Sequence, residues 1–404
     1  MRRVLSLALA AAALVVPAFA DEGMWLINRP PSEHLKKAYG FEPTPEWLEH
    51  VQKSAVRFST GGSGSIVSAG GLVMTNHHVA SDMLAKLSTP QRDLLEVGFH
   101  AVEPTEELKC PDLELLVLWS IGDVTERVKG AAEGLSGAEA NTARRRMMSQ
   151  IEQEAKEASG LHSEVVTLYQ GGVYHLYQYR RYTDVRLVFA PEQQAAFFGG
   201  DTDNFEFPRW CLDMTFFRIY EDGEPLRPEH HLRWSANGSN EGDLAFVVGH
   251  PGSTRRAYTS DHLAFLRDVE QVQTLNRLWR SEVKLQGFCS ASAENNRIGK
   301  DMLHGVANGR KARTGRLAGL LDPALMARKA EDERVLRAAV DAKPEWKKNW
   351  GDAWDQVAAA QKIHEEFYTR RAAIGGSSDL LGKAMTVLRL ADELPKPSAE
   401  RLRR

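Results

Sequence analysis

A pair of histidines offers the clearest chemistry in this 404-residue sequence. Residues 62–79 read GSGSIVSAGGLVMTNHHV, so Gly70-Gly71 predicts a hairpin between two short strands, the second ending just before His77 and His78. An imidazole exchanges protons near neutral pH, and a strand end holds it rigidly. We therefore predict that His78 is a general base with His77 as its neighbour. Without this context, a histidine pair would indicate only the end of a strand.

A carboxylate that could orient this base occurs much later in the chain. Asp213 opens the apolar segment DMTFFR at residues 213–218. A buried carboxylate hydrogen-bonded to a histidine fixes the tautomer of the ring and stabilises its charged form. We predict this role for Asp213. Two alternatives stay open: Asp213 is a solvated residue at a strand entry, or Asp201 or Asp203 orients the histidine instead.

A histidine base with an orienting carboxylate can activate a hydroxyl as a nucleophile, but no such hydroxyl is evident. A histidine presented at a strand end after a glycine hairpin resembles the base of chymotrypsin-like proteases, which take their serine from a second barrel. Ser63 lies between two glycines, but it belongs to the same hairpin that precedes His78. Ser378 precedes Asp379 and is better explained as a helix cap before Leu380. The sequence thus predicts a base and an orienting acid without a convincing nucleophile.

The elements that position these residues fall into two regions. Short strands with glycine-rich turns are predicted at residues 54–58, 64–68, 72–75, 113–119, 185–189, 214–220 and 244–248, with a hairpin turn at Asp222-Gly223 and one helix at residues 138–158. Helices are predicted at residues 261–286, 324–342, 345–373 and 380–393, with Asp322-Pro323 as a helix start. A mixed β and α fold follows, with a barrel or sandwich first and helices after it.

A set of aromatic residues in the second region predicts a buried helix face. Trp346, Trp350, Trp354 and Val357 recur at helical spacing. Such a stripe is far more often core than a ligand site, and we expect it to be core.

The N-terminus and the composition point to export. Arg2 and Arg3 precede a short apolar run, and Ala18-Phe19-Ala20 matches a cleavage site, so residues 1–20 are expected to be a signal peptide and the mature chain periplasmic, envelope-associated or secreted. No later run is long enough to cross a membrane.

The net charge of -3 argues against nucleic-acid binding. The sequence has three cysteines and neither a C-x-x-C pair nor an H-E-x-x-H motif, and we expect no metal or organic cofactor.

Four motifs, in order, carry a family resemblance. They are DEGMW at residues 21–25, TNHH at 75–78, GGDTDNF at 199–205 with Pro208-Arg209, and GHPGST at 249–254. Together they resemble the bacterial dipeptidyl-peptidase 7 and 11 family of chymotrypsin-clan serine exopeptidases, from residue 21 to about residue 373. The resemblance implies an incomplete chymotrypsin-like double β-barrel at residues 21–258 and part of an α-helical cap domain at residues 259–404.

The same resemblance implies the activity and its residues. The family releases dipeptides from the free N-termini of oligopeptides, with His78 as base, Asp213 as orienting acid, and Asn204 and Phe205 in the clamp for the substrate's amino group. Phe205 stands where the family usually has tryptophan, and Val79 replaces a cysteine. The family's serine segment has no counterpart in the 404 residues, so we expect this chain to be inactive alone.

Two other functions stay open on the sequence. A Deg-type envelope endoprotease shares the G-S-G and T-N-x-H-V pattern, but the helices after residue 261 and the Asp-Asn-Phe loop favour the exopeptidase. A non-catalytic peptide-binding remnant of such a peptidase is the second alternative. The sequence is compatible with a homodimer and contains nothing that decides the oligomeric state.

Overall fold

The structure is a computed structural model that describes residues 23–89, 91–198, 200–252, 255–375, 379–396 and 401. The expected signal peptide lies outside the described residues. So do Ser377 and Ser378, and parts of three motifs: Asp21-Glu22, Gly199 and Ser253-Thr254.

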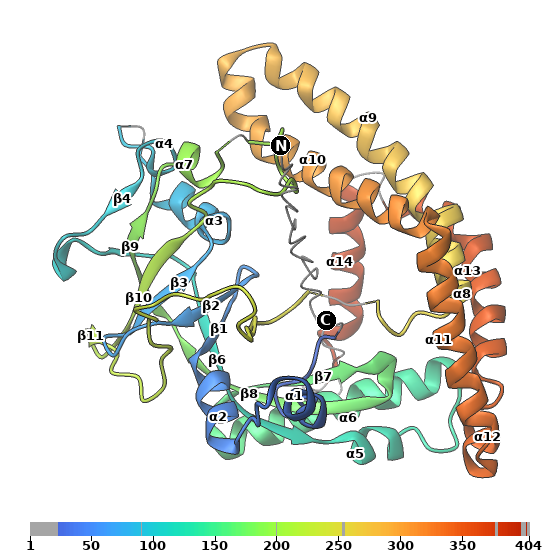
Figure 1. The fold of residues 1–404 in the computed structure, drawn as a ribbon. Helices are drawn as coiled ribbons and strands as arrows, with labels where there is room; N and C mark the ends of the chain where they lie inside the picture. The colour runs from blue at the N-terminus through green and yellow to red at the C-terminus, as the bar shows by residue number, and fades with distance from the viewer. Residues whose placement is uncertain are drawn as a thin grey trace, which may run out of the picture.

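The strands of the described residues form one eleven-stranded antiparallel sheet (Figure 1). Its main path runs β4-β9-β10-β3-β2-β1-β6-β8-β7, with β11 paired to β10 and β5 to β9. The strands are β1 Ala55–Phe58, β2 Ser63–Ile66, β3 Leu72–Thr75, β4 Phe99–His100, β5 Leu108–Lys109, β6 Leu115–Asp123, β7 His162–Leu168, β8 Val173–Tyr182, β9 Asp184–Ala190, β10 Thr215–Glu221 and β11 Glu224–Pro225.

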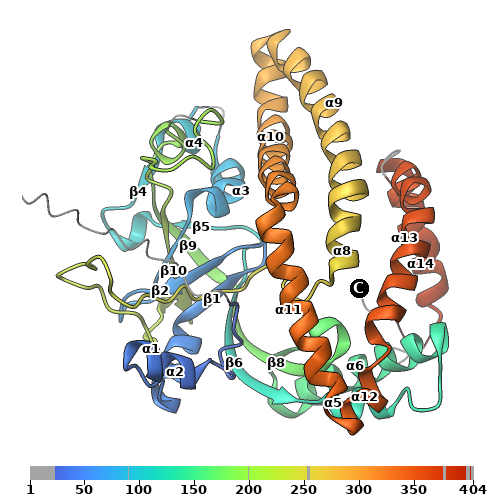
Figure 2. The same ribbon diagram turned by 45° about the vertical axis from the view of Figure 1, so that its right-hand side comes forward.

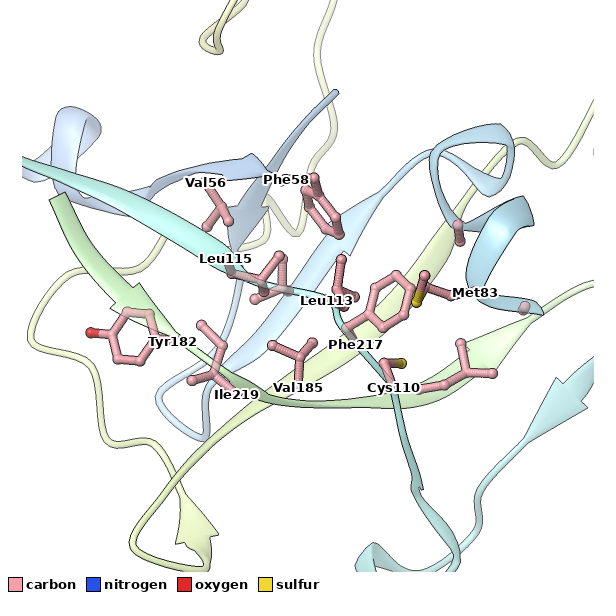
Figure 3. Packing of buried hydrophobic residues seen from close by; sticks show 14 of the residues in the cluster. Val56, Phe58, Met83, Cys110, Leu113, Leu115, Tyr182, Val185, Phe217 and Ile219 are labelled. Atoms are coloured by element: carbon pink, nitrogen blue, oxygen red, sulfur yellow. The ribbon is translucent and has the colours of Figure 1, made fainter. Parts of the chain in front are cut away.

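The main hydrophobic core indicates that this sheet curls around on itself. Leu115 of β6 and Val185 of β9 are both fully buried in one cluster, although β10, β3, β2 and β1 separate their strands in the sheet order. Figure 3 shows these two side chains together with Phe217 and Ile219 of β10 in the enclosed space. Burying each large apolar side chain contributes roughly 1.5–3 kcal/mol. The result is a barrel-like core with β3 and β10 side by side in its wall.

Short helices connect the strands of the sheet or precede them, and one long helix packs against β7. The short ones are α1 Ser32–Tyr39, α2 Pro45–Ser54, α3 His77–Leu87, α4 Leu94–Val97, α5 Thr125–Gly130 and α7 Gln193–Ala196, with 3-10 turns η1 Pro104–Glu106 and η2 Tyr169–Gly171. The long one, α6 Gly137–Ser159, confirms the helix predicted at residues 138–158 and buries Ile151 against Val165 of β7.

The second region is helical, as predicted, and lies to one side of the sheet (Figures 1 and 2). Its helices are α8 Ser260–Phe265, the π-helical turn η3 Leu266–Glu270, α9 Gln271–Ser290, α10 Ala293–Leu321, α11 Pro323–Asp341, α12 Pro344–Trp350, α13 Ala353–Gly375 and α14 Asp379–Glu393. Figure 2 shows α9 and α10 running side by side as a long hairpin. Asp322 caps α11 by accepting the backbone N–H of Ala324 at 2.9 Å, which confirms the predicted helix start. Within the described residues no helix is long and apolar enough to cross a membrane.

Two sequence predictions about these regions are wrong. Residues 244–248 do not form a strand: Val247 is fully exposed, and the partly exposed Phe246 packs on the rings of Phe41 and Trp47 instead of on a neighbouring strand. The tryptophan face is not core: Trp350 is half exposed, and Trp346 and Trp354 are only partly buried. The stripe is broken between α12 and α13, and Lys343 and Arg337 lie over the Trp346 and Trp354 rings.

The glycine hairpin before the histidines is confirmed. β2 and β3 pair antiparallel, with Ile66 opposite Val73, and the turn is closed by the Val67 N–H donating to the Leu72 carbonyl at 2.8 Å. Gly71 has φ 71°, and a Cβ there would lie 3.0 Å from the Leu226 carbonyl oxygen, so any other residue would be strained and crowded at this position.

Candidate active site

Strand pairing alone brings the two predicted catalytic residues together. β3 and β10 are neighbours in antiparallel register, with Thr75 opposite Thr215. His78 comes shortly after the end of β3, in the first turn of α3, and Asp213 comes shortly before the start of β10. Because antiparallel strands place the end of one beside the start of the other, both side chains lie at the same edge of the sheet.

The His78–Asp213 pair has the geometry of a base and an orienting acid. The Nδ1 of His78 lies 2.8 Å from Oδ2 of Asp213, and the backbone N–H of His78 donates to Oδ1 at 3.1 Å. With Nδ1–H donated to the carboxylate, Nε2 keeps its lone pair free to accept a proton. The His78 side chain is 71% exposed and that of Asp213 28%, so the ring lies at the surface while the carboxylate lies behind it.

The two groups stabilise each other's charged forms. The hydrogen bond to Asp213 raises the pKa of His78 above its ordinary value, against the opposing effect of desolvation. Burial opposes ionisation of Asp213, but hydrogen bonds from the His78 side chain and backbone hold the pKa of Asp213 below its usual range. The carboxylate is therefore ionised at neutral pH and supports a protonated imidazole.

His77 differs from His78 in its surroundings. Only 4% of His77 is exposed, and burial lowers the pKa of its ring. Its Nε2 is buried and has no hydrogen-bond partner among the described residues. A neutral buried imidazole cannot exchange protons with a substrate, so the geometry favours His78 as the base.

The loop with Asn204 and Phe205 lies against helix α10 rather than against the histidine. Asn204 donates through Nδ2 to Oδ1 of Asn308 at 3.0 Å and accepts from the Arg209 guanidinium at 3.0 Å. Phe205 adopts φ 68° and is 60% exposed. Within the described part of the chain, no hydrogen bond, ion pair or ring contact joins Asn204 or Phe205 to the pair.

The alternative carboxylates are placed elsewhere. Asp201 lies 3.5 Å from Nζ of Lys311 on α10, and Oδ1 of Asp203 is buried without a hydrogen-bond partner among the described residues. The carboxylate that hydrogen-bonds to His78 is that of Asp213.

Ser63 is engaged in holding the fold. Its Oγ accepts the backbone N–H of His250 at 2.7 Å, and its carbonyl accepts the hydroxyl of Thr75 at 2.8 Å. In the parts of the chain that the structure describes, no serine or threonine hydroxyl hydrogen-bonds to Nε2 of His78.

Two residues of this region were missed on the sequence. Asn76 hydrogen-bonds to Asp213 and stands directly before the histidines, so its position in TNHH was a signal. Asn308 is 104 residues away from Asn204, and nothing in its surrounding sequence signals the contact. Among the described residues no group of three or more histidine, cysteine, aspartate or glutamate side chains could hold a metal ion.

Comparison with known proteins gives the family of this chain. A family model described as Peptidase S46 matches residues 20–404. The chain belongs to this peptidase family.

Individual relatives support the same assignment. Dipeptidyl-peptidase 7 of Phocaeicola vulgatus is 30% identical over 361 residues, covering 81% of this chain and 49% of the relative. An Asp/Glu-specific dipeptidyl-peptidase of Porphyromonas endodontalis is 32% identical over 279 residues, covering 63% of this chain and 38% of the relative. The crystal structure of Porphyromonas endodontalis DPP11 in complex with the dipeptide Arg-Glu superposes with a TM-score of 0.76 at 25% identity, covering 90% of this chain and 55% of that one. The chain thus spans about half the length of the relatives it matches.

Proposed function

We propose that this chain carries the base and the orienting acid of a serine-type dipeptidyl-peptidase that acts on the free N-termini of oligopeptides. The observation that carries the proposal is the 2.8 Å contact between His78 Nδ1 and Asp213 Oδ2 at one edge of a barrel-like sheet. The family membership and the names of the relatives support a dipeptide-releasing peptidase.

In the proposed reaction, Nε2 of His78 takes the proton of a serine hydroxyl as its oxygen attacks the scissile carbonyl. Asp213 stabilises the imidazolium that forms and keeps the ring in the required tautomer. The same imidazolium then gives its proton to the leaving amine. No serine or threonine hydroxyl among the described residues hydrogen-bonds to Nε2 of His78, so the attacking hydroxyl is proposed to come from outside them.

Recognition of a free N-terminus is proposed for Asn204 and Phe205. An amide oxygen accepts two hydrogen bonds, so Oδ1 of Asn204 keeps one position for an α-ammonium group beside the Arg209 guanidinium. The exposed Phe205 ring offers a cation–π surface to the same charge. Asn308 holds the Asn204 amide from α10, so the helical region takes part in shaping this subsite.

Peptide binding tests this function independently of turnover. Calorimetry on the purified 404-residue chain should show a peptide with a free N-terminus binding at least roughly tenfold more tightly than its N-acetylated form, because one charge-assisted hydrogen bond contributes about 1.5–3 kcal/mol. Asn204→Ala should remove the preference, and Asn349→Ala, at an exposed position on α12, should keep it. Equal binding of free and blocked peptides would contradict the exopeptidase assignment.

Turnover tests the missing nucleophile. The chain alone should release no measurable dipeptide from a dipeptidyl reporter substrate, since loss of a triad serine costs on the order of a million-fold in turnover. A substantial rate that His78→Ala abolishes would contradict the prediction that this chain is inactive alone.

Export is part of the same proposal. Periplasmic or secreted protein should begin at Asp21, with residues 1–20 removed, when intact mass is measured on material from the native host. Recovery of the full-length chain from the cytoplasm alone would contradict export.

A further inference from the structure

Helix α3 begins at the site in an unusual way. Asn76 is its N-cap, with φ −75° and ψ 150°, yet the Asn76 side chain makes no capping hydrogen bond. Asparagine at this position ordinarily accepts a backbone N–H of the first helical turn through its own side chain. Here the backbone N–H of His78, in that first turn, is accepted instead by Oδ1 of Asp213 at 3.1 Å.

The Asn76 amide is used on Asp213 instead. Its Nδ2 donates to the backbone carbonyl of Asp213 at 3.1 Å and to the carboxylate Oδ2 at 3.2 Å. One amide nitrogen thereby ties the main chain of Asp213 to its own side chain. Oδ2 is also the atom that accepts from His78 Nδ1.

This exchange of partners restricts the carboxylate. Rotation of the Asp213 side chain away from His78 would break the bond from Asn76 and the cap of α3 together with the bond to the imidazole. The α3 N-terminus also carries partial positive charge, which favours an anion at this position. A carboxylate held by the imidazole alone would lack these additional constraints.

We propose that Asn76 is a positioning residue, which gives up its own capping role so that Asp213 both caps α3 and is fixed against His78. The catalytic use of the His78–Asp213 pair rests on the proposed function, whereas the positioning of Asp213 is a property of the folded chain. Asn76 does not touch the reacting atoms in this arrangement.

Asn76→Ser separates positioning from capping. A serine hydroxyl caps a helix as well as asparagine does, but it is too short to span the main chain and the carboxylate of Asp213. Thermal unfolding of the Asn76→Ser chain should therefore remain close to that of the wild type. Asn76→Ala should lower the unfolding temperature, since it offers no cap if Asp213 moves away.

The informative readout is the titration of His78, followed by nitrogen-detected histidine NMR on the full chain and assigned with His78→Gln. In wild type the pKa of His78 lies above its ordinary value because Asp213 holds the ring. In Asn76→Ser it should fall toward about 6.5, and the downfield Nδ1 proton of the His78–Asp213 bond should broaden or disappear. Asn76→Gln, with the same amide on a longer stem, should restore part of the shift.

The sign of the change discriminates between two explanations. If Asn76 acts only as a nearby dipole, its positive N–H end disfavours the protonated ring, so its removal would raise the pKa of His78. A rise, or no change, in Asn76→Ser would overturn the proposal. Ser292→Ala serves as the control, since Ser292 caps α10 by accepting the Asn295 N–H at 3.0 Å, and its loss should leave the His78 titration unchanged.

These outcomes stand apart from the peptidase proposal. A chain in which Asn76→Ser releases Asp213, but which binds free and blocked peptides equally, would retain the positioning role and lose the exopeptidase function. A chain that prefers free N-termini, but in which Asn76→Ser leaves the His78 titration unchanged, would retain the exopeptidase function and lose only the positioning role.

Discussion

The buried ion pair of Glu107 and Arg218 should stabilise the pairing of β10 with β3. β10 is the strand that follows Asp213. Glu107 accepts from Nε of Arg218 at 2.8 Å and from the Tyr220 hydroxyl at 2.8 Å, and Arg218 also donates to the Gly70 carbonyl at 2.9 Å. The Glu107 side chain is 2% exposed and that of Arg218 21%. The network thereby joins β10 to the hairpin between β2 and β3.

Glu107→Ala should destabilise the chain strongly. Removing one partner of a buried pair costs about 3–5 kcal/mol, because the remaining charge is left without compensation. Arg218 keeps some contact with water, so we expect about 2–4 kcal/mol, measured from the shift of the urea unfolding curve followed by circular dichroism. Replacing both partners, as in Glu107→Leu with Arg218→Met, should recover much of the loss, since no isolated charge is then buried.

An exposed pair provides the matched control. Arg181 and Glu114 lie 3.2 Å apart with side chains 53% and 37% exposed, so Glu114→Ala should cost no more than about 1 kcal/mol. A loss from Glu107→Ala no larger than that from Glu114→Ala would refute the argument that this network stabilises the strand pairing.

Three further outcomes follow from particular residues. Phe217→Ala should cost about 3–5 kcal/mol in urea unfolding, since Phe217 is fully buried in the main core; a loss below about 1 kcal/mol would contradict that packing. Burial, together with Arg57, lowers the pKa of His250 to about 4. As the pH drops from about 6.5 to about 4, His250 is protonated in the unfolded chain but not in the folded one, so the free energy of unfolding should fall by about 1–3 kcal/mol. His250→Gln should flatten this part of the profile of stability against pH, and an unchanged profile would contradict the prediction. Burial raises the pKa of the Cys110 thiol to about 12. Iodoacetamide at pH 8 should therefore label exposed Cys211 rapidly and leave Cys110 unmodified, as measured by mass spectrometry. Equal labelling would show that Cys110 is accessible.

The pieces of the site that depend on local pattern could be predicted from the sequence. Glycine at position 71 tolerates the positive φ that the turn needs, so the hairpin and the position of His78 after it could be predicted. Asp213 was predicted from the apolar segment it opens. Their contact, however, depends on the pairing of β3 with β10, which brings together distant parts of the chain and which no local pattern specifies.

Helix α10 shows where local propensity fails. Its sequence carries glycines at 299, 305, 309, 315 and 319, each of which costs about 1 kcal/mol relative to alanine in a helix, and no helix was predicted there. The helix forms because it packs along α9. Gly299 even permits the close approach, since a Cβ there would lie 2.8 Å from the sulfur of Cys289. The same tertiary packing places Asn308 against Asn204, a contact that sequence reasoning therefore missed.

The failed strand at residues 244–248 and the tryptophan stripe have a common cause. Both patterns report apolar side chains at a suitable spacing, but burial also requires a partner surface. Val247 has none among the described residues, and the helix that would have aligned the tryptophans is interrupted at Gly351. Periodicity alone could not reveal either fact.

The proposed role of His78 depends on the carboxylate of Asp213 holding its imidazole. Titration of His78 in the wild-type chain and in Asp213→Asn measures that dependence. We predict a wild-type pKa above the ordinary histidine value of about 6.5, with the proton of the neutral ring on Nδ1, and a clear fall of that pKa in Asp213→Asn. The same pKa for His78 in both proteins, or a neutral ring protonated on Nε2 in the wild type, would show that Asp213 does not hold the His78 ring.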